Sequence, residues 1–166
     1  MKSATDSQFT NARAMAFLRI SLGTLFLIFG QYKVFGTQFT LRGGFQFWIN
    51  KFLEDGAYPF MIPVLRGFVL PHATAIAFLV AYGELAIGMA LVFGVLVRPA
   101  SAFGLLYMLT LLFSANYPGA HAPFWQYFGA SLDHSVLALC FLGFLIGNSS
   151  TAWSLPGWRE QRAHKS

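Results

Sequence analysis

Residues 72–93 read HATAIAFLVAYGELAIGMALVF, and this stretch determines the class of fold. Its length matches the roughly 20 residues that a helix needs to cross about 30 Å of hydrocarbon. Glu84 is its one charged residue. The stretch therefore predicts a transmembrane helix that carries a carboxylate near the middle of the bilayer.

Three further stretches have the same character, at residues 14–35, 99–117 and 124–147. The turn from Gly94 to Arg98 is short, so the helices on either side of it are expected to form an antiparallel pair. The predicted fold is all-α, an integral membrane four-helix bundle. Residues 1–166 are expected to form a single membrane domain, with an amphipathic interfacial segment over residues 36–71.

Composition agrees with a membrane protein, because 56% of the residues are hydrophobic and only 10% are charged. Soluble domains carry about 25% charged residues. The net charge of +5 comes largely from the chain ends, which indicates contact with a membrane surface and no nucleic-acid partner. Cys140 is the only cysteine, which excludes an internal disulfide or a thiolate-bound cluster within this chain.

The Lys and Arg residues outside the apolar stretches predict the orientation. They are more numerous at the termini and in the 94–98 turn than in the connection between the first two spans. Cytoplasmic segments carry such an excess. We therefore expect a multi-pass membrane protein with both termini cytoplasmic and residues 36–71 outside.

The connecting segment contains a helical pattern of its own. Helical spacing relates the apolar residues Phe45, Trp48, Ile49, Phe52 and Leu53, while the polar residues Asn50, Lys51, Glu54 and Asp55 face elsewhere. This pattern is typical of a short amphipathic helix that lies in the membrane interface. The pattern leaves open whether the segment covers the mouth of the bundle as a lid or only rests on lipid.

The ionisable residues Arg19, Glu84, Asp133 and His134 fall well inside the predicted spans. A charge at the bilayer centre costs at least about 2.5–3.5 kcal/mol, so each one needs a partner, a proton or water. Arg19 is expected to pair with Glu84 or Asp133, either as a functional network or as an ion pair that only fixes helix register. His134 has the alternative of donating to a backbone carbonyl.

Residues at helical spacing predict which faces pack. Each polar residue shares a stripe with small residues, which allow helices to approach closely in lipid. Leu22 lies off these stripes and is expected to face lipid. The four stripes are Arg19, Gly23, Phe26, Gly30 and Lys33; Ala77, Ala81, Glu84, Gly88 and Leu91; Ala100, Gly104, Tyr107, Leu111 and Ser114; and Gly129, Asp133, Val136, Cys140 and Gly143.

The remaining candidates have plain structural alternatives. Lys33 near the end of the first span can snorkel to the interface, and Tyr107 can serve packing alone. His72 lies at the start of its span and His134 inside another, so paired haem ligation is not expected. The sequence contains no HExxH, phosphate-loop or dinucleotide motif, and we expect neither haem nor a metal in this chain.

Two groups of residues resemble a known family. The first runs from Leu18-Arg19-Ile20 through Gly23, Phe26, Gly30 and Lys33, and the second joins Glu84 and Gly88 to Gly94, Arg98 and Ala100. Both are similar to motifs of the DoxX/DoxD family, over most of the chain from Arg19 to the end of the fourth span. The resemblance implies a four-helix inner-membrane protein, and relatives include membrane subunits of thiosulfate:quinone oxidoreductase. The resemblance also implies that the functional positions of the family correspond to Arg19, Lys33, Glu84 and Arg98.

The leading hypothesis is therefore a membrane subunit associated with a quinone-linked oxidoreductase. Glu84 and Asp133 are the candidates for proton transfer. The expected cofactor is a quinone, and the expected partners are the lipid bilayer and other protein subunits that supply electrons. The alternative is a non-catalytic scaffold whose internal charges specify packing, and a small transporter is a third hypothesis. The candidates for holding a ligand are Arg19, Lys33, Arg98, His134 and Tyr107.

Overall fold

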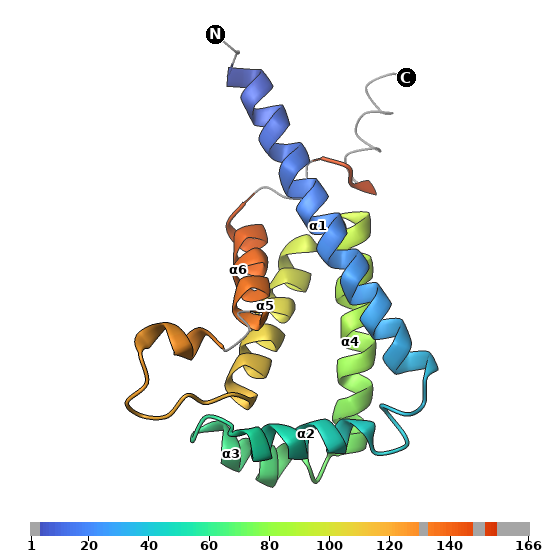
Figure 1. Ribbon diagram of the computed structural model, residues 1–166. Coiled ribbons are helices and arrows are strands. Elements are labelled where there is room, and N and C mark those ends of the chain that lie inside the picture. Colours follow the sequence, from blue (N-terminus) through green and yellow to red (C-terminus); the bar gives the residue numbers. More distant parts are fainter. Residues whose placement is uncertain (1–3, 130–132, 148–151, 156–166) are drawn as a thin grey trace.

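The computed structural model describes residues 4–129, 133–147 and 152–155, and within these ranges it contains helices and no strand (Figure 1). The all-α prediction is confirmed. The elements in chain order are α1 (Ala4–Phe35), α2 (Gly44–Asp55), α3 (Met61–Val64), the π-helix η1 (Leu65–Val69), α4 (Ala73–Phe93), α5 (Val97–Ser114), the 3-10 helix η2 (Phe124–Phe128) and α6 (Asp133–Ile146).

Three of the described helices are long and apolar enough to cross a membrane: Thr10–Phe35 of α1, α4 and α5. They correspond to the first three predicted spans. The predicted fourth span, residues 124–147, is wrong in its first part. Residues Phe124–Phe128 form η2, and Gly129 then adopts a φ of 93° that a continuous right-handed helix does not allow.

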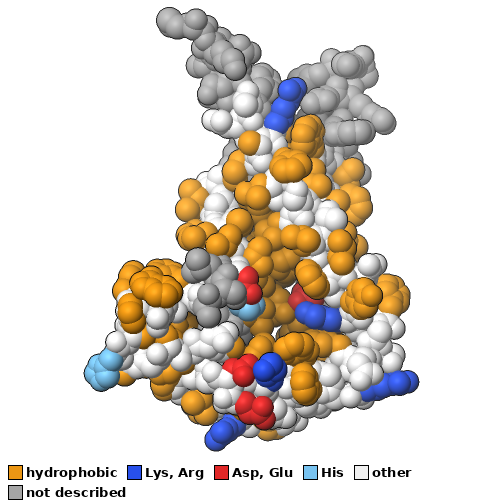
Figure 2. All heavy atoms as spheres, viewed as in Figure 1, with side chains coloured by type: hydrophobic (Ala, Val, Ile, Leu, Met, Phe, Trp, Pro, Cys, Tyr) orange, Lys and Arg blue, Asp and Glu red, His pale blue; other side chains and the backbone are white. Residues whose placement is uncertain are grey.

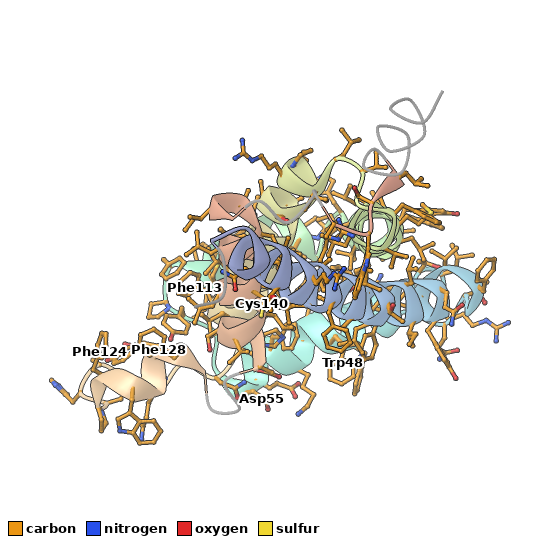
Figure 3. The ribbon with its side chains drawn as sticks, turned by 90° about the horizontal axis from the view of Figure 1, so that it is seen from above. Trp48, Asp55, Phe113, Phe124, Phe128 and Cys140 are labelled. Carbon is orange, nitrogen blue, oxygen red and sulfur yellow. The ribbon has the colours of Figure 1, made fainter. Side chains whose placement is uncertain are left out.

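The described part of helix α6 is shorter than the predicted span. Its 14 residues give a length of about 21 Å at 1.5 Å per residue, less than the roughly 30 Å of hydrocarbon in a bilayer. Figure 3 shows Phe124 and Phe128 of η2 at the margin of the molecule, away from Cys140 of α6. The aromatic run that made residues 124–128 look membrane-spanning thus belongs to a peripheral turn.

Helices α1 and α4 cross closely, because glycines lie where their backbones meet. A Cβ atom added to Gly88 would lie 2.8 Å from the backbone nitrogen of Leu27, and one added to Gly30 would lie 2.9 Å from that of Leu85. A Cβ on Gly23 would lie 2.8 Å from the Cβ of Leu91. These three glycines are at helix contacts, as their spacing predicts.

The packing face of α6 differs from the predicted one. Ser135, Ala138, Phe141 and Phe144 are buried, whereas Asp133 and Val136 are exposed. Phe141 occupies the space beside Gly104 of α5, where an added Cβ would lie 2.3 Å from its ring. A buried aromatic ring therefore sets the rotation of α6, and the polar residue at its start does not. Leu22 of α1, predicted to face lipid, is 4% exposed in the same core.

The amphipathic helix predicted within residues 36–71 is confirmed as α2. Phe45 and Ile49 are buried against the first turns of α4, while Phe47 and Trp48 are exposed. Figure 1 shows α2 and α3 lying across one end of the bundle, with the start of α1 and the segment 152–155 at the other end. Tyr58 fastens this layer to α5, because its N–H donates to the Phe113 carbonyl over 3.1 Å.

Candidate functional site

Glu84 lies in the middle of α4 and is the central residue of the site. It is 5% exposed. Its Oε1 atom accepts hydrogen bonds from the Lys33 ammonium of α1 and, over 2.7 Å, from the Tyr107 hydroxyl of α5. Three helices thus direct one polar side chain each to the same point, because the small-residue stripes of α1 and α4 bring these helices together.

The second carboxylate oxygen of Glu84 has no such partner. Oε2 is buried and makes no hydrogen bond within the described part of the chain. A buried polar atom left without a partner costs about 1–3 kcal/mol, and more when the group is charged. A proton, a water molecule or a ligand that made a hydrogen bond with Oε2 would therefore stabilise the site.

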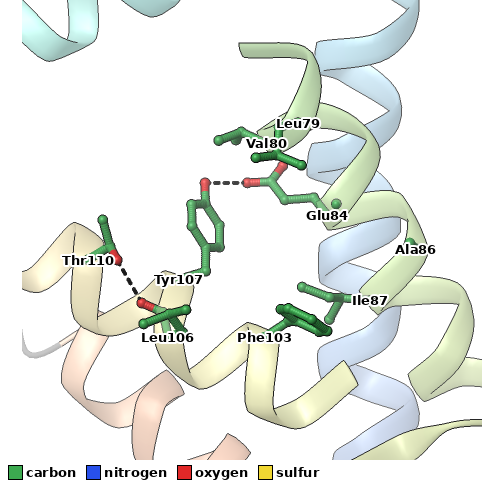
Figure 4. Close-up of a pocket in the computed structure, with 10 residues that line it drawn as sticks. Leu79, Val80, Glu84, Ala86, Ile87, Phe103, Leu106, Tyr107 and Thr110 are labelled. Carbon is green, nitrogen blue, oxygen red and sulfur yellow. Dashed lines mark hydrogen bonds between the residues drawn. The ribbon is translucent and has the colours of Figure 1, made fainter. Parts of the chain in front are cut away.

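A groove of about 500 Å³ lies between α4 and α5, with Glu84 and Tyr107 in its wall (Figure 4). The other lining residues are almost entirely apolar. Leu79, Phe103 and Leu106 on its rim are each more than 60% exposed. In a membrane such side chains face acyl chains, so the groove opens toward lipid.

A smaller pocket of about 210 Å³ shares Glu84 and Tyr107 with the groove and is otherwise lined by different residues. Its polar lining comes from four helices, with Lys33 from α1, Glu84 from α4, Tyr107 from α5 and His134 from α6. Figure 2 shows acidic, basic and histidine side chains within the apolar surface of the molecule at this level. The structure thus gathers four of the predicted site residues around one cavity.

Asp133 joins this group through His134. Its Oδ1 atom lies 3.3 Å from Nδ1 of His134 and accepts the His134 backbone N–H over 2.8 Å. The sequence predicts that Asp133 points into the bundle from the middle of a span. It is instead the first described residue of α6, and its side chain is 57% exposed.

Arg19 lies at the opposite end of the bundle, and the prediction that it pairs with Glu84 or belongs to one polar network with it is wrong. Lys33 occupies that role instead, fourteen residues further along α1, which is about 21 Å of helix. Arg19 is fully buried and donates to the Trp153 carbonyl over 2.7 Å and to the Ala152 carbonyl over 3.4 Å.

Gly94 explains how Arg19 is accommodated. It ends α4 in the left-handed conformation, with a φ of 68°, and an added Cβ would lie 2.3 Å from a guanidinium nitrogen of Arg19. Arg19 and Gly94 together hold the segment 152–155 against the turn between α4 and α5. Arg98 is exposed in the first turn of α5. Neither arginine contributes to the two cavities.

Sequence reasoning missed the groove itself. Gly83, Ala86, Phe103 and Leu106 line it, and none of them carries a polar atom on its side chain. A Cβ on Gly83 would meet nothing within 4 Å, but no local pattern distinguishes such a glycine from Gly88 five residues later. Within the described residues, no three His, Cys, Asp or Glu side chains are grouped so that they could hold a metal ion.

These observations define a multi-pass membrane protein with one charged cluster inside its helical bundle, bordered by a groove that opens toward lipid. The DoxX family model matches residues 14–116. This is more than half of the 166 residues, and the chain belongs to the DoxX family. The match covers α1 to α5, including Lys33, Glu84 and Tyr107, and ends before α6, short of the extent predicted from the motifs. No curated protein and no solved structure matched the chain.

Proposed function

We propose that this DoxX family protein is the membrane subunit of a quinone-linked oxidoreductase, and that the groove between α4 and α5 holds the quinone ring. One observation carries the proposal: the buried Oε2 atom of Glu84 lacks a hydrogen-bond partner within the described residues, at the wall of an apolar groove. A ring oxygen, or the hydroxyl that forms from it, supplies the missing partner.

The groove suits this kind of ligand in size and polarity. Its volume of about 500 Å³ falls in the range of about 300–1,000 Å³ that small-molecule sites occupy, typically apolar with a few placed polar groups. An isoprenoid quinone dissolves in the hydrocarbon of the membrane, and its ring reaches Glu84 past Leu79 and Phe103. Its tail stays among the acyl chains.

Glu84, Lys33 and Tyr107 have different roles in this proposal. A bound quinone would supply two-electron chemistry that is coupled to protons. Glu84 gives or takes the proton, as carboxyl groups do in general acid–base catalysis. Lys33 compensates the charge of the carboxylate, and Tyr107 orients it through the 2.7 Å hydrogen bond.

The electrons come from other subunits under this proposal. The alternative is a non-catalytic scaffold, and the hydrogen bonds of Glu84 are also consistent with that function. The bonds of Glu84 with Lys33 and Tyr107 join α1, α4 and α5, and an ion pair of this kind can specify helix register without taking part in chemistry.

Filling the groove separates these two functions. The change Gly83→Phe places a ring in the groove, because nothing lies within 4 Å of an added Cβ there. We expect it to weaken the binding of decylubiquinone to the protein in lipid nanodiscs by at least about tenfold, which is about 1.4 kcal/mol. Equilibrium dialysis measures the binding.

The control is Gly143→Phe in α6. An added Cβ at Gly143 also meets nothing within 4 Å, but Gly143 does not line the groove. It should leave binding unchanged. If the unaltered protein binds no quinone, or if Gly83→Phe binds it normally, the groove is not a quinone site and the scaffold function stands.

A further inference from the structure

The smaller pocket has a feature that the quinone site alone does not need. Glu84 and Tyr107 line both cavities, whereas Lys33 and His134 line only the smaller one. Glu84 therefore borders both the groove and a second compartment, whose largely apolar lining also contains Lys33 and His134.

This compartment has the size and the lining to hold water. A water molecule occupies about 30 Å³ in the liquid, and a buried water needs two to four polar partners. The pocket volume of about 210 Å³ accommodates several molecules, and the Lys33 ammonium, the Glu84 carboxylate, the Tyr107 hydroxyl and the His134 ring supply partners. Water in the pocket would connect Glu84 to His134.

The exposed neighbour of His134 opens a way from the pocket to the outside. His134 is the second residue of the helix, and its Nδ1 lies 3.3 Å from an oxygen of Asp133, whose side chain is 57% exposed. An exposed carboxylate facing hydrocarbon is strongly unfavourable. The exposure of Asp133 therefore indicates a hydrated surface beside this residue.

We propose that His134 and the smaller pocket form the proton path of the quinone site, and that the path ends at the hydrated surface beside Asp133. This inference rests on the proposed function. Reduction of a quinone takes two electrons from the partner subunit and two protons. For each proton, the O–H bond of Glu84 breaks as one forms at a ring oxygen, and the carboxylate then regains a proton from His134 through water.

His134 in turn recovers its proton from water beside Asp133, and oxidation of a quinol runs the same transfers in reverse. Nδ1 of His134 faces the Asp133 carboxylate, so a proton taken up at Nδ1 from that side allows the other ring nitrogen to release its proton toward Glu84. His134 thus acts through Glu84 and does not touch the ring. Its role is to deliver the proton to Glu84. His134 lies outside residues 14–116, which the family model matches.

The water in the pocket can be tested without any quinone. Leu137 of α6 lines the pocket, while Leu139 on the same helix is 65% exposed and does not line it. In a Cys140→Ser background we expect Leu137→Cys to react with a charged methanethiosulfonate in nanodiscs, and Leu139→Cys to stay unlabelled in lipid. Leu111→Cys, from α5, repeats the test should Leu137→Cys fail to fold.

The second measurement uses an electrode as the source of electrons and infrared spectroscopy to follow quinol formation in decylubiquinone-loaded nanodiscs. We expect His134→Ala to bind quinone normally but to slow quinol formation by about tenfold or more, since positioned acid–base groups contribute at least this much. Added imidazole should restore the rate. His72→Ala, at the start of α4, is the control and should have no effect.

Unreactive thiols at both pocket positions, labelling of Leu139→Cys as strong as that of Leu137→Cys, or an unchanged rate in His134→Ala would each overturn the proton path. A slow His134→Ala protein that imidazole does not rescue would also overturn it, because the loss would then be structural. These outcomes leave quinone binding intact. Failure of the unaltered protein to bind quinone instead overturns the proposed function.

Discussion

The change Gly88→Ala is expected to lower the melting temperature of the purified protein by about 2–12 °C. The added Cβ would lie 2.8 Å from the backbone nitrogen of Leu27 and 2.9 Å from the carbonyl oxygen of Gly23. Neither atom can move without shifting α1 as a whole. Overpacking of this kind costs about 1–3 kcal/mol, and thermal unfolding in detergent measures it.

Gly83→Ala on the same helix is the matched control. Its Cβ meets nothing within 4 Å, and alanine favours a helix over glycine by up to about 1 kcal/mol. The melting temperature should therefore stay the same or rise. Equal losses at both positions would mean that the close approach of α1 and α4 at Gly88 does not stabilise the protein.

The double change Lys33→Met with Glu84→Gln is expected to fold and to bind quinone, yet to form quinol about a hundredfold more slowly. Glutamine keeps the shape of Glu84 and can still accept from the Tyr107 hydroxyl, but it cannot exchange a proton. Replacing both members of a buried ion pair is often close to neutral for stability, because neither charge is left alone.

The single change Glu84→Gln shows the contrast. It leaves Lys33 without its carboxylate, and breaking a buried pair costs up to about 3–5 kcal/mol. The loss should be smaller here, because the Lys33 side chain is 24% exposed and can turn outward. Melting temperatures and electrode-driven quinol formation are measured on both proteins. A folded double variant with normal quinol formation would leave Glu84 a purely structural role.

The contact between α1 and α4 could be predicted from the sequence because small residues recur at fixed spacing. Arg19, Gly23, Phe26 and Gly30 are all buried, as are Ala77, Ala81, Glu84, Gly88 and Leu91. In lipid, where apolar side chains are equally stable inside and outside the bundle, glycines and polar groups mark the contact faces. That signal is local, and the structure confirms it.

The partner of Glu84 and the rotation of α6 could not be predicted in this way. Spacing gives the face of a helix but not its tilt, so it does not tell whether Arg19 or Lys33 reaches the depth of Glu84. In α6 nearly every position is apolar, so the sequence offers no second signal to show whether the face that contains Asp133 is the buried one. Phe141 against Gly104 determines that packing, a fit of shape between two helices that neither sequence shows alone.

The most direct test of a quinone ring at Glu84 is photoaffinity labelling with an azidoquinone. The unaltered protein in nanodiscs is illuminated, and the labelled residues are found by mass spectrometry. We expect adducts on the walls of the groove in α4 and α5, among Leu79, Val80, Phe103 and Leu106. Excess decylubiquinone should suppress them, and Gly83→Phe should abolish them. Adducts spread evenly over the lipid-facing helices, undiminished by competing quinone, would contradict the account.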